Sequence, residues 1–382
     1  FPTRRSSDLG NKMDAVTKLF AGYTIGDESY RQVDRFCSPY GKRVLLIGGE
    51  TGMSKGLPVL CEALKAADSR LEIVDAAVYG TECTYERIRE LSSLYKDKAI
   101  DMVFGMGGGK AMDTAKGAAY ELGVPVFTFP TIPSNCASMA ALSVVYRKDG
   151  GFDSFYFFER PAVHCFINTD IMIHAPKMYF RAGMGDTIAK YFECHFSARG
   201  DELDYHSALG REISNLCYER IRTYAGKALA EFGEGKAGEA FTQAVLAITV
   251  NTGLVSHMVE DCYNCALAHA VCYGLDLIPG VAERFLHGDL VGYGILIQLA
   301  VDGQSGTLAK VRKLLKSMEI PVTLKEMGVA LDKEFLRDML KESVSGPDME
   351  HIPYPVTEDM VWEAVCKVEA WCNSSDKSVH LQ

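Results

Sequence analysis

The sequence lacks an excess of positive charge and lacks any long hydrophobic run. Its 40 Lys and Arg residues are outnumbered by 50 Asp and Glu residues, which gives a formal net charge of −10. Because a negative chain is a poor partner for nucleic acid or for an anionic membrane surface, we expect neither. No apolar stretch approaches the roughly 20 residues that a membrane-spanning helix needs. We therefore expect a small molecule to be the main ligand.

Paired cysteines are also scarce. The chain has 12 cysteines, but only Cys262 and Cys265 have C-x-x-C spacing, and no second pair complements them. Most of the others stand singly in apolar patterns, where free cysteine is a common small core residue. Since the sequence has no secretory signal, these thiols predict a reducing, cytoplasmic location rather than a disulfide framework.

The first residues do not resemble part of a fold. The segment Phe1–Gly10 has neither a starting Met nor an apolar stretch. We interpret residues 1–12 as a leader or an artefact of sequence assembly, and we expect the native sequence to begin near Met13.

Residues 43–175 alternate between strand and helix patterns. Such alternation is typical of a mostly parallel sheet with helices on both faces. The expected strands are Arg43–Ile47, Leu71–Val78, Ile100–Phe104, Val124–Phe129, Phe155–Phe158 and Ala162–Asn168, and the expected helices are Lys55–Ala66, Tyr85–Tyr95 and Ala111–Leu122.

Strand patterns disappear from Pro176 onward, and helical periodicity takes their place. We therefore predict an α/β dinucleotide-binding domain over residues 13–175 and an all-α domain over residues 176–382. A ligand site is expected in the cleft between them. The expected helical segments are Gly183–Ser197, His206–Glu231, Ala237–Thr252, Asp289–Ala300 and Met360–Cys372.

The segment Gly105–Lys116 joins a predicted buried strand to a predicted helix, with Asp113 expected in the first turn of that helix. Three consecutive glycines allow backbone N–H groups to approach a ligand, and the following helix N-terminus carries partial positive charge. These are the properties of a pyrophosphate site, to which Lys110 would add a charge.

This glycine segment matches neither of the two common phosphate loops. A P-loop needs Ser or Thr after its lysine, whereas Lys110 is followed by Ala111, and Gly-x-Gly-x-x-Gly fails because its last position is Lys110. The segment can also be a tight connection without a ligand, so the rest of the chain must decide.

The helical half contains an Asp and two His residues in glycine-marked, apolar surroundings. Asp186 is expected near the start of a helix, His269 inside a helix of small residues, and His287 just before the helix that begins around Asp289. Three such residues from separate elements can hold a divalent metal with one open position. That position would accept a substrate oxygen, whose pKa the metal would lower.

Simpler explanations exist for the same residues. Asp186 can be a helix N-cap, or it can form an i, i+4 ion pair with Lys190. Either histidine can be a hydrogen-bonded structural residue.

Taken together, the motifs resemble those of the iron-containing or polyol alcohol dehydrogenase family, and within it the glycerol dehydrogenases. The resemblance covers residues from about 18 to 372. The segments that carry it are Gly105–Lys116, Phe129–Ser134, Ala140–Tyr146, Gly185–Asp186, Leu267–Ala270 and Leu286–Gly288.

The resemblance implies a dehydroquinate synthase-like architecture with the active site between the two domains. It implies a metal held by Asp186, His269 and His287, and hydride transfer between a nicotinamide and a small alcohol or carbonyl substrate. It also implies a homo-oligomer. The residues implied at the cofactor are Gly49, Glu50, Gly107, Gly108, Gly109, Lys110, Thr131, Ser134, Leu142 and Tyr146.

The chain departs from the family pattern at the metal and at the substrate. Lys190 occupies the place where iron enzymes add a third histidine, so we expect zinc rather than iron. The lysine also resembles one found at this place in enzymes of the same superfamily that act on phosphorylated substrates. Cys136 replaces the expected glycerol-binding carboxylate, and a thiol accepts hydrogen bonds poorly. Cys272 replaces a histidine often found three residues after the first histidine ligand. Glycerol itself is therefore not the expected substrate.

The chain also departs from the family pattern at the predicted cofactor site. NAD-preferring members carry an acid at the position of Gly49, where it binds the ribose 2′-hydroxyl. Gly49 leaves room for the 2′-phosphate of NADP, whereas Glu50 would repel it. We expect NAD, with NADP as the alternative.

Three functions fit these residues. The leading one is a metal-dependent NAD(P) alcohol or polyol dehydrogenase. The second is an enzyme acting on a phosphorylated substrate, either a dehydrogenase or a lyase of the dehydroquinate synthase kind that uses NAD transiently. The third is a non-catalytic nucleotide-binding protein, against which the presence of all three candidate ligands argues.

Overall fold

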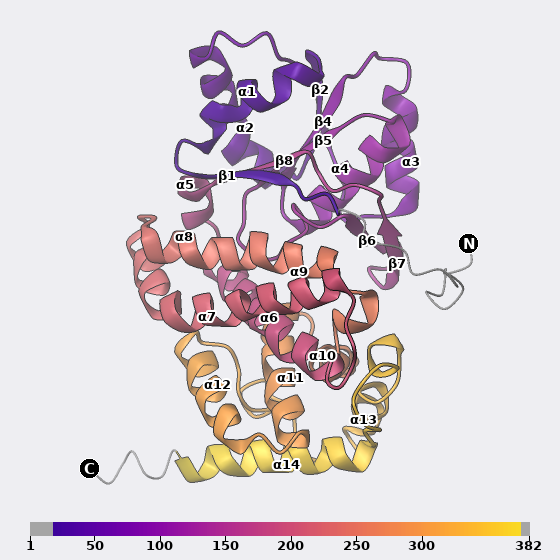
Figure 1. The fold of residues 1–382 in the computed structure, drawn as a ribbon, viewed down its shortest axis with the longest axis vertical. Coiled ribbons are helices and arrows are strands. Elements are labelled where there is room, and N and C mark those ends of the chain that lie inside the picture. The colour runs from indigo at the N-terminus through magenta and orange to yellow at the C-terminus, as the bar shows by residue number, and fades with distance from the viewer. Residues whose placement is uncertain (1–17, 376–382) are drawn as a thin grey trace.

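The computed structural model describes residues 18–375, with side chains to residue 370. The predicted leader, residues 1–12, lies outside the described residues. A sheet-containing half and a helical half follow one another along the chain (Figure 1). Within the described part, no helix combines the length and the apolarity required to cross a membrane.

Six parallel strands form the sheet of the N-terminal half, in the order β1-β8-β5-β4-β2-β3. The predicted α/β class with a mostly parallel sheet is therefore confirmed. The strands are β1 (Gly22–Gly26), β2 (Arg43–Gly48), β3 (Glu72–Val78), β4 (Met102–Gly107), β5 (Val126–Pro130) and β8 (His164–Asn168).

The central strands are apolar on both sides because both faces of the sheet are covered. In β2, Val44 and Leu46 belong to one buried cluster, while Leu45 and Ile47 belong to another on the opposite face. This alternation follows from the two-residue period of a strand. The helices of this half are α1 (Val33–Cys37), α2 (Glu50–Ala66), α3 (Tyr85–Tyr95), α4 (Gly109–Leu122) and α5 (Thr169–Ile173).

A separate antiparallel ribbon consists of β6 (Leu142–Tyr146) and β7 (Phe152–Phe157). The segment Phe155–Phe158, predicted as one more strand of the alternating pattern, thus falls mostly in this ribbon and not in the main sheet. Lys116 of α4 holds the start of the ribbon. Its buried ammonium contacts Asp113 at 2.9 Å and donates to the carbonyl oxygens of Ala137 and Leu142.

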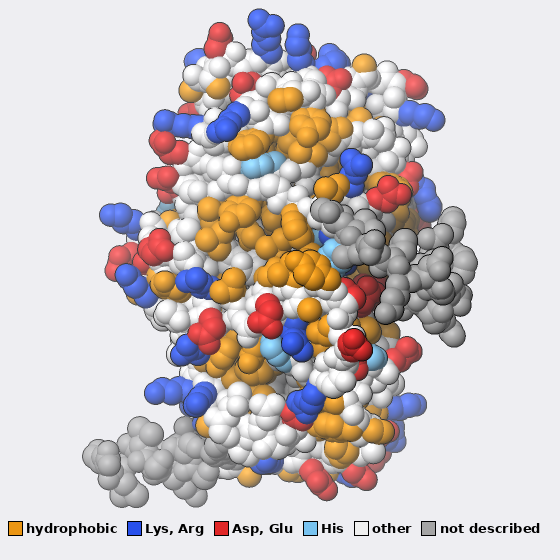
Figure 2. All heavy atoms as spheres, viewed as in Figure 1, with side chains coloured by type: hydrophobic (Ala, Val, Ile, Leu, Met, Phe, Trp, Pro, Cys, Tyr) orange, Lys and Arg blue, Asp and Glu red, His pale blue; other side chains and the backbone are white. Residues whose placement is uncertain are grey.

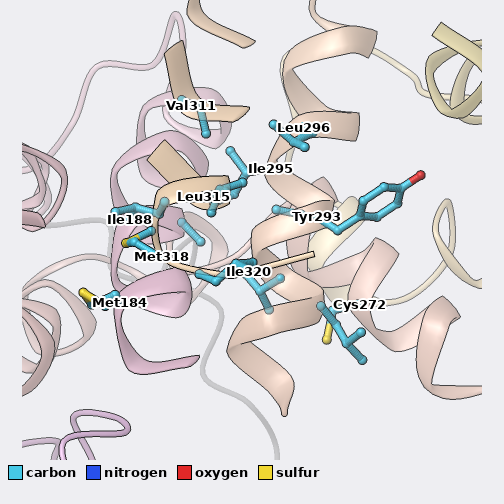
Figure 3. Close-up of a cluster of buried hydrophobic side chains, with 14 of the residues drawn as sticks. Met184, Ile188, Cys272, Tyr293, Ile295, Leu296, Val311, Leu315, Met318 and Ile320 are labelled. Atoms are coloured by element: carbon cyan, nitrogen blue, oxygen red, sulfur yellow. The ribbon is translucent and has the colours of Figure 1, made fainter. Parts of the chain in front are cut away.

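The remainder of the described chain is helical, as predicted. Figure 3 shows its core, where side chains of α6, α11 and α12 meet around Ile188, Ile295 and Leu315. The helices are α6 (Lys177–Ser197), α7 (Tyr205–Glu234), α8 (Glu239–Leu246), α9 (Thr252–Met258), α10 (Leu267–Asp276), α11 (His287–Val301), α12 (Ser305–Ser317), α13 (Arg337–Glu342) and α14 (Glu358–Ser375). We retain the proposed domain division between residues 175 and 176, which falls between α5 and α6.

The predicted start of α2 at Lys55 is wrong, because the helix begins at Glu50. Two further predicted helix starts are also wrong. Helix α6 begins at Lys177 and not near Gly183, so Asp186 lies well inside the helix and cannot be its N-cap. Helix α4 begins at Gly109, which places Asp113 in the second turn, buried against Lys116. In both cases glycines hide the helix start, because they are poor helix formers that are kept here for close packing.

The surface carries charges of both signs. Figure 2 shows Lys and Arg side chains interspersed with Asp and Glu on one face, and hydrophobic side chains gathered toward the middle of that face. On this face the basic side chains are interrupted by acidic ones, so the face offers no broad positive field to a polyanion.

Candidate active site

The glycine segment lies where a parallel sheet of this order binds ligands. Strand β3 lies on one side of β2, whereas β4 and then β5 lie on its other side. The direction in which successive strands are added to the sheet therefore reverses between β2 and β4. Ligands of open α/β sheets bind at the carboxyl ends of the strands at such a reversal. Gly49 follows β2 as the N-cap of α2, and Gly108 follows β4 as the N-cap of α4. Two helix N-termini therefore lie together at this edge.

Backbone proximity explains why these positions are glycine. Gly107 has φ +143°, which side chains rarely adopt. A Cβ atom on Gly109 would lie 2.6 Å from the Asn135 amide, and one on Gly52 would lie 2.7 Å from the Gly107 Cα atom. A hollow remains beside the loop, lined by Gly107, Gly108, Gly109, Met112, Pro130, Ile132, Asn135 and Ser138.

The two charged side chains predicted at the cofactor, Lys110 and Glu50, differ in their surroundings. Lys110 Nζ lies 2.6 Å from Glu82 Oε1 and above the ring of Tyr146, so in this structure its charge is paired. Glu50 is exposed at the first position of α2, directly after Gly49. A carboxylate at this position is also stabilised by the helix N-terminus.

The other predicted cofactor residues lie along the segment that leaves β5. Thr131 is buried, and its N–H donates to the carbonyl of Gly107. Ser134 follows on the same segment, whereas Leu142 and Tyr146 lie half-buried on β6. Thr131 contacts Gly107 of the glycine loop, and Tyr146 contacts Lys110 at its end, so two different elements reach the loop.

This segment also connects the strand edge with the helical half. A Cβ atom on Gly183 of α6 would lie 2.4 Å from the carbonyl oxygen of Pro133 and 3.1 Å from Ser134 Cα. Helix α6 thus contacts the segment after β5 backbone to backbone. Asp186 lies one turn further along the same helix.

The structure brings together Asp186, His269 and His287, which come from α6, α10 and α11. One ligand atom from each lies within 4.8 Å of the others. His269 Nε2 is 3.5 Å from Asp186 Oδ1, and the two imidazole centroids are 5.2 Å apart. One carboxylate and two imidazoles at this separation suit a divalent metal with an open coordination position.

Glycines next to the candidate ligands allow the helices to approach. A Cβ atom on Gly288, which follows His287, would lie 1.9 Å from the carbonyl oxygen of Ala182. A Cβ atom on Gly185, which precedes Asp186, would lie 2.3 Å from the carbonyl oxygen of Gly288. The contact between α6 and α11 is therefore closest beside the two ligands that these helices contribute.

The charges in this cluster support one another. Burial would raise the pKa of Asp186, but the hydrogen bond from His269 and the positive charges nearby outweigh it and lower that pKa. Burial would lower the pKa of His269, but the carboxylates of Glu193 and Asp186 are among the groups that raise it well above its ordinary value. The cluster therefore attracts a cation, which is a proton when no metal is bound.

His287 differs from His269 in its surroundings. The crowding of protein atoms around it and the charge of His269 lower its pKa to about 4, although part of the side chain is open to solvent. A neutral imidazole at this place is the form that a metal requires.

The predicted substrate residues lie beside the cluster. Lys190 is buried and donates from Nζ to the carbonyl oxygen of Asn264 at 2.9 Å. Burial would lower its pKa, but the Asp186 and Glu193 carboxylates are among the groups that raise it, so the ammonium stays charged. Burial raises the pKa of Cys136, which keeps the thiol neutral and speaks against a nucleophilic role.

The structure adds a contact of Cys272, which the sequence analysis noted, and two residues that sequence reasoning missed, Tyr273 and Glu193. Cys272 Sγ lies 3.4 Å from His287 Nδ1, so the residue noted as a departure touches a candidate ligand. The ring of Tyr273 has its centroid 6.2 Å from that of His269 and 6.3 Å from that of His287. Glu193, two turns after Asp186 on α6, contacts His269 directly. In the sequence, Glu193 is marked by its position seven residues after Asp186. That spacing does not indicate which groups its side chain contacts.

Known proteins match this chain over nearly its whole length. Residues 21–164 match the family model described as iron-containing alcohol dehydrogenase. A glycerol dehydrogenase of Thermotoga maritima is 31% identical over 92% of this chain and 96% of that protein. Hydroxycarboxylate dehydrogenase A of Escherichia coli is 31% identical over 77% of this chain and 82% of that protein.

Solved structures agree with the fold. The crystal structure of glycerol dehydrogenase from Schizosaccharomyces pombe superposes with a TM-score of 0.85, covering 96% of this chain and 94% of that one at 22% identity. The 31% identity to the Thermotoga maritima protein over 92% of this chain confirms the family resemblance inferred from the motifs. The chain belongs to the iron-containing alcohol dehydrogenase family and is an oxidoreductase.

Proposed function

We propose that this protein transfers a hydride between NAD and a small alcohol whose hydroxyl is held at Asp186, His269 and His287. The convergence of these three side chains carries the proposal. Gly183, one turn before Asp186, contacts the segment that leaves β5 beside the glycine loop. A nicotinamide reaching inward from that loop would therefore meet an alcohol held at the cluster.

A divalent metal at the cluster would polarise the substrate hydroxyl, and the nicotinamide would accept the hydride. The protein residues prepare this step. Asp186, His269 and His287 would supply the charge and the donor atoms that hold the cation, and the centroid of the Tyr273 ring lies 6.2 and 6.3 Å from those of the two imidazoles. The N-termini of α2 and α4 would hold the pyrophosphate, with Gly107, Gly108 and Gly109 providing close approach.

Zinc is the metal that we propose. The donor set suits zinc with three protein ligands, and iron also accepts two histidines and one carboxylate. The third histidine of the iron members is replaced by Lys190, whose ammonium cannot ligate a metal.

A substrate with an anionic group is a second candidate. Lys190 contributes a buried ammonium beside the cluster, so a positive charge is available to a bound substrate. A carboxylate or a phosphate on the substrate would compensate this positive charge. Glycerol has neither group, and its hydroxyls would lack the hydrogen bonds to the carboxylate that Cys136 replaces. Hydroxy acids and phosphorylated alcohols therefore belong beside simple diols in any substrate screen.

The test of the proposed function is such a screen, in which NAD(P)H absorbance is followed with diols, hydroxy acids and phosphorylated alcohols. The protein is first stripped with a chelator and then supplied with zinc or iron. We expect steady, metal-dependent accumulation of NADH. Turnover of a phosphorylated sugar acid without net NADH would instead establish a dehydroquinate synthase-like lyase, and nucleotide binding without turnover would contradict both.

Lys190→Met tests the anionic substrate. Loss of a charged hydrogen bond costs about 1.5–3 kcal/mol, so kcat/KM for a hydroxy acid should fall about 10- to 100-fold. The change for a neutral diol in the same variant should be much smaller, which makes the diol an internal control. Equal losses for both substrates would assign Lys190 to support of the Asn264 backbone alone.

Glu50→Gln tests the choice of cofactor. Removal of this carboxylate should lessen its repulsion of a 2′-phosphate, and a gain of about 1 kcal/mol would shift the ratio of kcat/KM values toward NADP about fivefold. Glu62→Gln, an exposed change on the same helix, is the matched control. An unchanged ratio in Glu50→Gln would remove this residue from cofactor selection.

A cytoplasmic location and a homo-oligomeric assembly stay predictions. Light scattering of the purified protein measures the second directly.

A further inference from the structure

Glu193 is a fully buried carboxylate that the proposed chemistry does not use. Its side chain has no exposed surface, and it lies two turns after Asp186 on α6. An ionised carboxylate in a protein interior is costly unless its oxygens are hydrogen-bonded and its charge is compensated. The partners of Glu193 therefore indicate what it does.

One oxygen of Glu193 caps helix α10. Oε1 accepts the N–H groups of Ala266 and His269, each at 2.8 Å. The N-cap position of α10 is Ala266, whose side chain cannot accept a hydrogen bond. Glu193 thus supplies from another helix the negative charge and the acceptor that this helix start lacks.

The other oxygen fixes the His269 ring. Oε2 lies 2.5 Å from His269 Nδ1, while His269 Nε2 faces Asp186 Oδ1 at 3.5 Å. The two nitrogens are therefore directed to opposite partners. In the neutral imidazole that a metal requires, a carboxylate at Nδ1 keeps the remaining proton on that nitrogen and leaves the Nε2 lone pair toward the cluster.

We propose that Glu193 is a positioning residue for the metal site, which it serves by fixing the ring and the tautomer of His269 through both of its oxygens. Metal-binding histidines commonly donate their second N–H to a carboxylate in this way, and loss of that partner weakens metal binding about 10- to 100-fold. Helix α6 thus carries two functions on one face, the ligand Asp186 and the support of the ligand His269. This inference rests on the proposed metal site.

Glu193→Gln separates positioning from capping. The amide oxygen can still accept the N–H groups at the start of α10. The amide NH₂, however, would face Nδ1 as a donor, so His269 would have to carry its proton on Nε2 and lose that atom as a ligand. We expect the zinc affinity of the nucleotide-free protein, measured by competition with a chelating dye, to fall about 10- to 100-fold.

Two further variants complete the test. Glu193→Asp keeps the charge at a shorter reach and should recover part of the affinity. Glu369→Gln neutralises another buried carboxylate, which accepts from the Leu324 N–H and the Tyr293 hydroxyl outside the cluster, and should leave zinc affinity unchanged. NADH affinity and the unfolding midpoint are recorded for each variant, and we expect Glu193→Gln to retain NADH binding. The nitrogen chemical shifts of His269 should report the exchange of tautomer.

The outcomes are distinct. If the parent protein binds no metal, the proposed function fails. If the parent binds zinc and Glu193→Gln binds it equally well, or if Glu193→Asp is no better than Glu193→Gln, the positioning role is wrong and Glu193 serves only to cap α10.

Discussion

Replacement of His269 by alanine should release the bound metal and lower turnover about 10³-fold or more. A metal held by these residues would stabilise developing charge on the substrate oxygen by several kcal/mol, and each 1.36 kcal/mol is a factor of ten in rate. His269 is central to the cluster because its Nε2 lies 3.5 Å from Asp186 Oδ1 and its ring centroid lies 5.2 Å from that of His287. Metal content by mass spectrometry and kcat with a preferred alcohol are the measurements.

Binding of NADH controls for folding in this variant. The glycine loop lies on the other side of the segment after β5, so the affinity for NADH should stay close to that of the parent protein. His174→Ala, an exposed histidine at the end of α5, should retain both metal and turnover. Parent-like metal content in His269→Ala would refute the ligand assignment.

Replacement of Gly288 by alanine should damage the site without removing any polar group. The added Cβ atom would lie 1.9 Å from the carbonyl oxygen of Ala182, so α11 must move away from α6. His287 and Asp186 would separate with the helices, and a displacement of 1 Å in an active site can cost roughly 100-fold in rate. Overpacking of this kind also lowers the free energy of unfolding by about 1–3 kcal/mol.

Gly226→Ala is the matched control for Gly288→Ala. A Cβ atom on Gly226 would have no neighbour within 4 Å, and this glycine lies inside α7. Alanine there should stabilise the protein slightly, by about 0.5–1 kcal/mol, and leave metal content unchanged. If Gly288→Ala keeps its metal and its kcat, close packing of α6 and α11 is not what holds the ligands together.

The sequence predicted the sheet-containing half well because strands such as Val44–Ile47 are continuously apolar and are bounded by glycines. It missed β1 (Gly22–Gly26), a short edge strand that reads only as tyrosine, threonine and isoleucine between two glycines. It placed the start of α6 too late, because the glycines that allow close approach near Asp186 also weaken the helical pattern. Sequence patterns report propensity, and these positions are determined by packing.

The candidate site could be predicted only as separate parts. Glycine spacing and family motifs named Asp186, His269 and His287, but the distance between them depends on how three helices cross. Glu193 carried no signal of its own, because a glutamate seven residues after an aspartate is ordinary on any helix. Its burial and its contact with Nδ1 of His269 exist only in the folded chain.

The most direct test of the metal site is an anomalous difference map from crystals grown with zinc and NAD. We predict one strong zinc peak, coordinated by Asp186, His269 Nε2 and His287 at about 2.0–2.2 Å, with the cofactor pyrophosphate at Gly107–Gly109. A peak at other residues, such as Cys262 and Cys265, with none at Asp186 would contradict the account.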